Sequence, residues 1–231
     1  MPRRPRMYLP GIPAHIVQRG NNREPCFFSK DDYVYYLQCL KHALSRYKVK
    51  LHAYVLMTNH VHLLMTPVDE SGISKVMSLI GKNYVLYINK TYRRSGTLWE
   101  GRHKSSLIDA DKYLFHCYRY IEMNPVRAGM TRKPDEYRWS SYAYHAWGKE
   151  NDLIDDHELY RALGNGNDKD RLYAYRELFR VDLSDENIHE ISHAIHYNYP
   201  LGNERFKELI EKTLQRQVGY DKRGRPNATT G

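Results

Sequence analysis

The chain has 231 residues, of which 41% are hydrophobic and 27% charged, a composition that predicts a soluble globular protein with one main core. No apolar run approaches the roughly 20 residues that span a bilayer, and no apolar signal segment follows the basic N-terminus, so no membrane association is expected. The three cysteines are widely spaced, which argues against a disulfide framework or a zinc ribbon and favours a reducing cytoplasm.

Positive charge is distributed unevenly along the chain. The net charge of +9 predicts a polyanionic partner, although excess lysine and arginine can also serve solubility alone. Residues 150–190 hold 12 acidic and 5 basic residues, so the positive excess lies elsewhere. We expect DNA phosphate contacts from Arg3, Arg4, Arg6, Arg19, Arg23, Lys82, Arg93, Arg94, Arg102 and Lys104. The 21 tyrosines against 5 phenylalanines favour stacking of unpaired bases.

The hydrophobic pattern predicts six elements in the first half of the chain. They are a strand at 15–19, a helix at 31–49, a two-stranded hairpin at 51–67, a helix at 71–92 and a strand at 105–108. This order predicts an α+β fold, a ferredoxin-like or RRM-like antiparallel sheet with helices on one face. A helix at 111–123 is expected to stop before Pro125, with short helices and acidic loops from 133 to 200 and a last helix at 204–215.

Two histidines lie in the second strand of the hairpin. Side chains alternate along a strand, so His60 and His62 share one face while Val61 points into the core. Neutral imidazole is the commonest metal ligand, but two ligands rarely hold a hard divalent ion, so a third is expected from elsewhere. A chance pair is the alternative in a chain with 12 histidines, although the strand–turn–strand context favours a site.

The helix at 111–123 carries a polar stripe. His116, Tyr120 and Asn124 are spaced four residues apart and therefore lie on one face, which can also be a simple solvent-facing surface. Mg²⁺ or Mn²⁺ on His60, His62 and the amide oxygen of Asn124 would orient and polarise a phosphate that the Tyr120 hydroxyl attacks. The product of such a site is a covalent phosphotyrosine.

These motifs carry a family resemblance. His60-Val61-His62 followed by the segment 120–129 resembles the HUH single-tyrosine transposases of the IS200 type. Four further segments, at 2–6, 18–23, 139–142 and 224–226, are similar to its REP-associated branch. The resemblance implies a metal-dependent single-stranded DNA endonuclease and strand transferase. Such a transposase cuts beside hairpins at repetitive extragenic palindromes through a 5′-phosphotyrosine link.

The resemblance also implies site residues and domains. Tyr120 is the expected nucleophile, and His60 and His62 are expected metal ligands. Asn124 stands where insertion-sequence relatives carry Gln, so His116 remains open as a competing third ligand. We expect a transposase domain at 1–132, a mainly helical extension with a basic tail at 133–231, and a monomer. The alternatives are a domesticated DNA-hairpin-binding regulator without cleavage and, less well supported, a phosphodiesterase for small nucleotides.

Overall fold

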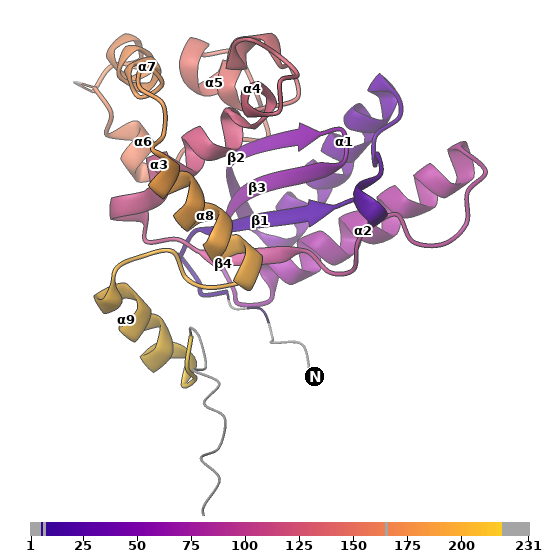
Figure 1. The fold of residues 1–231 in the computed structure, drawn as a ribbon, viewed down its shortest axis with the longest axis horizontal. Coiled ribbons are helices and arrows are strands. Elements are labelled where there is room, and N and C mark those ends of the chain that lie inside the picture. Colours follow the sequence, from indigo (N-terminus) through magenta and orange to yellow (C-terminus); the bar gives the residue numbers. More distant parts are fainter. Residues whose placement is uncertain (1–5, 7, 165, 219–231) are drawn as a thin grey trace, which may run out of the picture.

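The computed structural model describes residues 6, 8–164 and 166–218. Four strands form one antiparallel sheet in the order β2-β3-β1-β4 (Figure 1). The strands are β1 (Ala14–Arg19), β2 (Val49–Met57), β3 (His60–Pro67) and β4 (Lys104–Leu107). Helices α1 (Lys30–Tyr47) and α2 (Gly72–Thr91) cover one face of this sheet. The predicted order of elements and the α+β class are confirmed.

The hairpin of β2 and β3 sets which side chains face each layer. In β3, Val61, Leu63 and Met65 belong to the core cluster that includes α1 and α2. His60 and His62 alternate with them and lie on the other face. The first predicted helix ends two residues earlier than expected, since Lys48 adopts a left-handed conformation with φ 50° and starts the turn into β2.

A buried carboxylate anchors the start of α1. Asp32 accepts hydrogen bonds from the backbone N–H groups of Phe28 at 2.7 Å and Ser29 at 2.8 Å, which satisfies donors that the first helical turn leaves unpaired. The Tyr92 hydroxyl, just after α2, donates to the same carboxylate at 2.9 Å. This contact ties the beginning of α1 to the end of α2.

The C-terminal half of the chain covers part of the second sheet face. Helix α3 (Ala110–Glu122) packs on β2 and β3, and α8 (Asp185–Tyr197) crosses β4 and β1 (Figure 1). The remaining elements are η1 (Asn21–Arg23), α4 (Asn124–Arg127), η2 (Pro134–Glu136), α5 (Tyr142–Trp147), α6 (Glu158–Arg161), α7 (Asp168–Glu177) and α9 (Glu204–Leu214). Among the described residues, no helix is both long and apolar enough to cross a bilayer.

A buried hydrogen-bond network joins α3 to this extension. The Glu122 carboxyl group accepts hydrogen bonds from the Ser141 hydroxyl at 2.6 Å and the Tyr175 hydroxyl at 2.6 Å. Nδ1 of His145 lies 2.7 Å from the same carboxyl group. All four side chains are buried, so the network holds the last turn of α3 at one rotation about its axis.

Candidate functional site: a histidine pair beside a tyrosine helix

Each histidine of β3 has its Nδ1 within hydrogen-bond distance of another side chain. Nδ1 of His60 lies 2.6 Å from the amide oxygen of Asn59, and Nδ1 of His62 lies 2.8 Å from Nε2 of His15 on β1. When each Nδ1 donates in these bonds, each Nε2 keeps a lone pair for a ligand. Partners of this kind are what orient histidines that bind metal ions.

Burial keeps both imidazoles neutral. His62 is only 5% exposed and His60 is half-buried. Burial, assisted by the charge of Arg19, lowers the pKa of His60 to about 4. Burial and the neighbouring His15 hold the pKa of His62 well below its usual range. Neutral imidazole is the form that binds metal ions, so neither histidine needs to lose a proton at neutral pH.

Helix α3 brings Tyr120 against this pair. The centroid of its ring lies 5.8 Å from the His62 ring and 5.8 Å from the His15 ring, in edge-to-face contacts. The Arg127 guanidinium lies over the Tyr120 ring, 4.4 Å from the centroid, and also donates to the Tyr120 carbonyl oxygen. The hydroxyl group lies 3.1 Å from the Ser192 hydroxyl on α8. The ring is therefore held on several sides.

Asn124, one turn beyond Tyr120, completes the cluster. Its Nδ2 lies 3.5 Å from Nε2 of His62 and donates to the Tyr120 carbonyl oxygen at 3.2 Å. No three His, Cys, Asp or Glu side chains of the described residues gather closely enough to hold a metal ion. Neutral oxygen donors, such as a side-chain amide, also bind Mg²⁺ and Mn²⁺. In this structure Nδ2 of Asn124 faces His62, and a half-turn about the last side-chain bond puts the amide oxygen there instead.

His116 makes different contacts. Its Nδ1 lies 3.0 Å from the Lys112 carbonyl oxygen, and its ring packs beside the Tyr113 ring, both on α3 itself. Of the two candidates for a third ligand, His116 and Asn124, Asn124 is the one whose side chain contacts His62.

The predicted DNA-binding residues fall into separate groups. Arg19 pairs directly opposite His60 between β1 and β3, so it extends the histidine face of the sheet. Arg6, Arg102 and Lys104 line a hollow at the β4 edge. Lys82, Arg93 and Arg94 lie on or just after α2, in the layer on the other face, while Arg23 is exposed in η1. Arg3, Arg4 and the basic tail after residue 218 lie outside the described residues.

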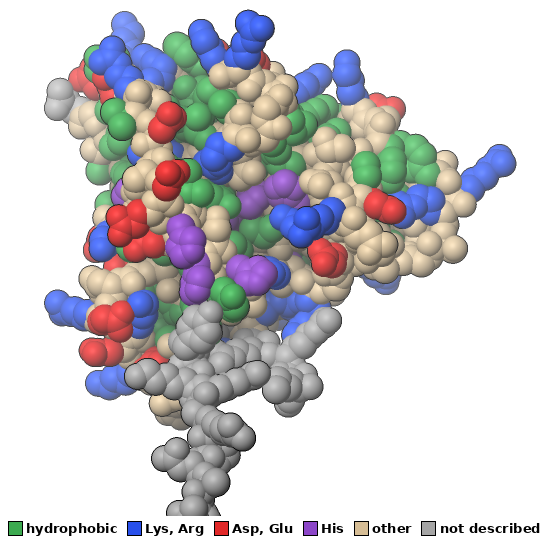
Figure 2. Space-filling view, viewed as in Figure 1, with side chains coloured by type: hydrophobic (Ala, Val, Ile, Leu, Met, Phe, Trp, Pro, Cys, Tyr) green, Lys and Arg blue, Asp and Glu red, His purple; other side chains and the backbone are tan. Residues whose placement is uncertain are grey.

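Histidines also gather on α8. Figure 2 shows histidine side chains clustered on the face where Figure 1 places this helix. Its sequence contributes His189, His193 and His196. These histidines were not predicted to belong to the site, because the sequence predicts only short helices and acidic loops for residues 133–200.

Three contacts of the site were not predicted. The alternation of strand 15–19 places His15 and Arg19 on one face, and this pattern was the one available signal for His15. Arg127 follows Tyr120 by seven residues, two helical turns away, but the chain enters a new short helix between them. Ser192 lies 72 residues from Tyr120, and no motif in its neighbourhood marks it.

Known proteins resemble this chain over the segment that holds His60, His62, Tyr120 and Asn124. Residues 9–124 match a family model described as transposase, IS200 like. A solved structure of a REP-associated tyrosine transposase bound to a REP hairpin aligns with a TM-score of 0.52 and 17% identity, over 73% of this chain and 94% of that one. A putative transposase from Deinococcus radiodurans R1 aligns with a TM-score of only 0.36 and 15% identity, over 50% and 94%. No curated protein gave a significant match. The chain belongs to the family of IS200-like transposases.

Proposed function

We propose that this protein is a metal-dependent single-stranded DNA endonuclease and strand transferase that acts at REP-type hairpins. The observation that carries the proposal is the convergence of Tyr120 from α3 and Asn124 from α4 on His62 from β3. The structurally similar REP-associated transposase is described as bound to a REP hairpin, and we extend that class of ligand to this chain.

In the proposed reaction, Tyr120 is the nucleophile. Its hydroxyl oxygen attacks the scissile phosphorus, the bond from phosphorus to the 3′ oxygen breaks, and the DNA stays linked through a 5′-phosphotyrosine. The phenolic proton is lost to solvent and the leaving 3′ oxygen takes one up. The phosphodiester energy is retained in the link, so a free 3′ hydroxyl can attack it and rejoin the strand.

Three side chains would hold the cofactor. His60, His62 and Asn124 offer two neutral imidazole nitrogens and one amide oxygen, which suit Mg²⁺ or Mn²⁺ together with water. When bound, such a cation would polarise the scissile phosphate and offset the negative charge of the transition state. The His15 and Asn59 contacts orient the two imidazoles for this task.

We also propose that the active unit is a monomer. The tyrosine helix and the histidine strand of one chain pack on each other, so the cluster needs no residue from a second copy. The proposed division is a transposase domain at 1–132 and an extension at 133–231. Ser192 of that extension contacts Tyr120, which supports a role for it in the same site.

Covalent capture tests this function. The protein is incubated with single-stranded hairpin DNA and Mg²⁺ or Mn²⁺, and mass spectrometry locates any adduct, with Tyr120→Phe and a chelator as controls. An adduct on Tyr120 that requires the metal is the expected result. Hairpin binding with no adduct under any metal would overturn the proposal in favour of the binding-only regulator.

A further inference from the structure

A basic hollow lies where the start of β4 meets the end of α8. It encloses about 360 Å³, within the size range of small-ligand sites. Arg6, Arg102 and Lys104 line it together with Tyr197 and Asn198. Among the described residues that line it, one carboxylate, Glu100, and the carboxyl end of α8 stand against three cationic side chains.

Two of the three cationic side chains, Arg6 and Lys104, are held by protein groups. Nε of Arg6 donates to the His103 carbonyl oxygen at 3.1 Å, and Nζ of Lys104 lies 3.2 Å from Nδ1 of His196 on α8. Burial, together with the nearby charge of Arg19, lowers the pKa of Lys104. An anion entering the hollow would therefore meet an organised positive field.

The Tyr197 ring lines the hollow beside these cationic side chains. Tyr197 is 41% exposed, and its ring is 5.8 Å from the Tyr199 ring in a stacked arrangement and 4.6 Å from the His193 ring. The next residue, Asn198, ends α8 in a left-handed conformation and accepts a hydrogen bond from the Ser105 N–H at 3.0 Å. An exposed aromatic ring beside cationic groups suits an unpaired base and its phosphate.

The hollow lies on the same face of the sheet as the histidine pair, two strands away. His60 on β3 lies opposite Arg19 on β1, and Lys104 on β4 pairs with Val17 of the same β1 strand. Because neighbouring strands are about 4.8 Å apart, β3 and β4 are separated by about 10 Å. Arg19 follows Val17 by two residues on β1, so its side chain lies on the same face of the sheet as His60 and Lys104.

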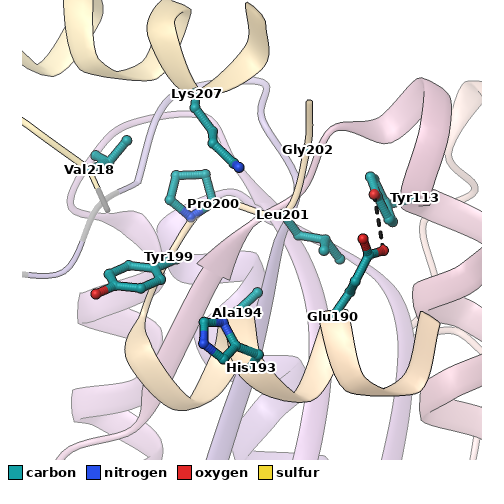
Figure 3. A pocket seen from close by; sticks show the side chains of 10 residues that line it. All are labelled: Tyr113, Glu190, His193, Ala194, Tyr199, Pro200, Leu201, Gly202, Lys207 and Val218. Carbon is teal, nitrogen blue, oxygen red and sulfur yellow. Dashed lines mark hydrogen bonds between the residues drawn. The ribbon is translucent and has the colours of Figure 1, made fainter. Parts of the chain in front are cut away.

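A second hollow beside α8 is mainly apolar, in contrast to the basic hollow. Figure 3 shows it between α8 and the segment that leads into α9, with mainly apolar walls. Its polar groups already pair with protein: the Tyr113 hydroxyl donates to Glu190 at 3.1 Å, and Lys207 forms an ion pair with Glu204 at 2.6 Å. The Glu190 carboxylate disfavours a phosphate there. Lys207 is therefore a suitable control for Lys104, because it is a lysine that lines a hollow outside the proposed DNA path.

We propose that the basic hollow binds one nucleotide of the single strand next to the cleaved phosphate. A backbone phosphate contacts Arg102 and Lys104, and the unpaired base packs on the Tyr197 ring. The extension would then select DNA with an unpaired flank beside the hairpin, a property that duplex DNA lacks. This inference rests on the proposed function, because it assigns the hollow to the same DNA strand.

Binding measurements test the subsite without any cleavage. All variants carry Tyr120→Phe, and the probe is a fluorescent hairpin oligonucleotide with an oligo-thymidine flank, followed by anisotropy at several salt concentrations. Lys104→Gln is expected to reduce the salt slope of binding by about 1, while Lys207→Gln leaves it unchanged. Tyr197→Ala is expected to weaken binding by about 5- to 150-fold and Tyr197→Phe to retain affinity, since phenylalanine still stacks.

Abasic substitutions along the flank locate the base. At one flank position, loss of the base and Tyr197→Ala are expected to have non-additive effects, whereas at the other positions their effects add. Unchanged affinity of Tyr197→Ala and Lys104→Gln, or equal losses on a blunt hairpin, would overturn the subsite while leaving the proposed function in place. If the Tyr120→Phe protein binds no hairpin at all, the proposed function fails together with the subsite.

Discussion

The hydroxyl group of Tyr120 lies 3.1 Å from the hydroxyl group of Ser192. The first residue lies on α3 and the second on α8, 72 residues further along the chain. Helix α8 also contacts β1 and β4, so the C-terminal extension reaches from the candidate nucleophile to the edge of the sheet. The extension therefore borders the site directly.

Loss of the Ser192 hydroxyl should slow adduct formation. Ser192→Ala removes one neutral hydrogen bond that orients the Tyr120 oxygen, and a bond of this kind contributes about 1 kcal/mol, or roughly fivefold in rate. Ser192→Thr keeps the hydroxyl and should remain close to the parent. The measurement is the single-turnover rate of covalent adduct formation, together with hairpin affinity, which we expect to stay constant. Equal rates for Ala and Thr would contradict this role.

Metal affinity should distinguish the two candidate third ligands. Asn124→Ala removes the amide beside His62 and is expected to weaken Mn²⁺ binding by about tenfold or more, whereas His116→Ala should leave it unchanged. Asn124→Gln keeps the amide oxygen and should retain measurable affinity. Isothermal titration with Mn²⁺ gives the comparison. The reverse pattern, with loss in His116→Ala alone, would assign the ligand to His116.

The buried network at Glu122 should contribute strongly to stability. Glu122→Ala leaves the buried Ser141 and Tyr175 hydroxyls and Nδ1 of His145 without their acceptor, which should lower the free energy of unfolding by about 3 kcal/mol or more. Glu208→Ala, at an exposed position of α9, serves as the control and should change it by less than about 0.5 kcal/mol. Urea denaturation measures both, and similar midpoints would contradict the assignment.

Stability should fall in mild acid partly because of His52. Burial lowers the pKa of this imidazole to about 4, against about 6.5 in the unfolded chain, so the unfolded state takes up a proton first as the pH falls. Between about pH 6.5 and pH 4 this one group should reduce the free energy of unfolding by about 1.4 kcal/mol per pH unit.

Urea titrations across that pH range check the effect of His52. His52→Gln should show a shallower pH dependence than the parent, because the substituted residue takes up no proton in either state. The exposed His189→Gln should follow the parent curve. Parallel curves for His52→Gln and the parent would show that another group is responsible.

Local sequence patterns determined the fold class and the centre of the candidate site. The two-residue period of a strand places His60 and His62 on one face. The four-residue helical spacing predicted Asn124 beside Tyr120, and the structure keeps them close although Tyr120 lies in α3 and Asn124 begins α4. Both placements follow from residues close together in the sequence, because the backbone geometry of a strand or helix sets its period. For the same reason, the hydrophobic pattern predicted the order of the four strands and of the two α-helices between them.

Only the tertiary structure decided which distant groups complete the site. His15 reaches His62 through the pairing of β1 with β3, and Ser192 reaches Tyr120 because α8 folds back across the sheet. The predicted basic residues likewise divided between the histidine face and the α2 layer. Such contacts depend on strand register and helix packing between segments far apart in the chain, and no local period in the sequence specifies them.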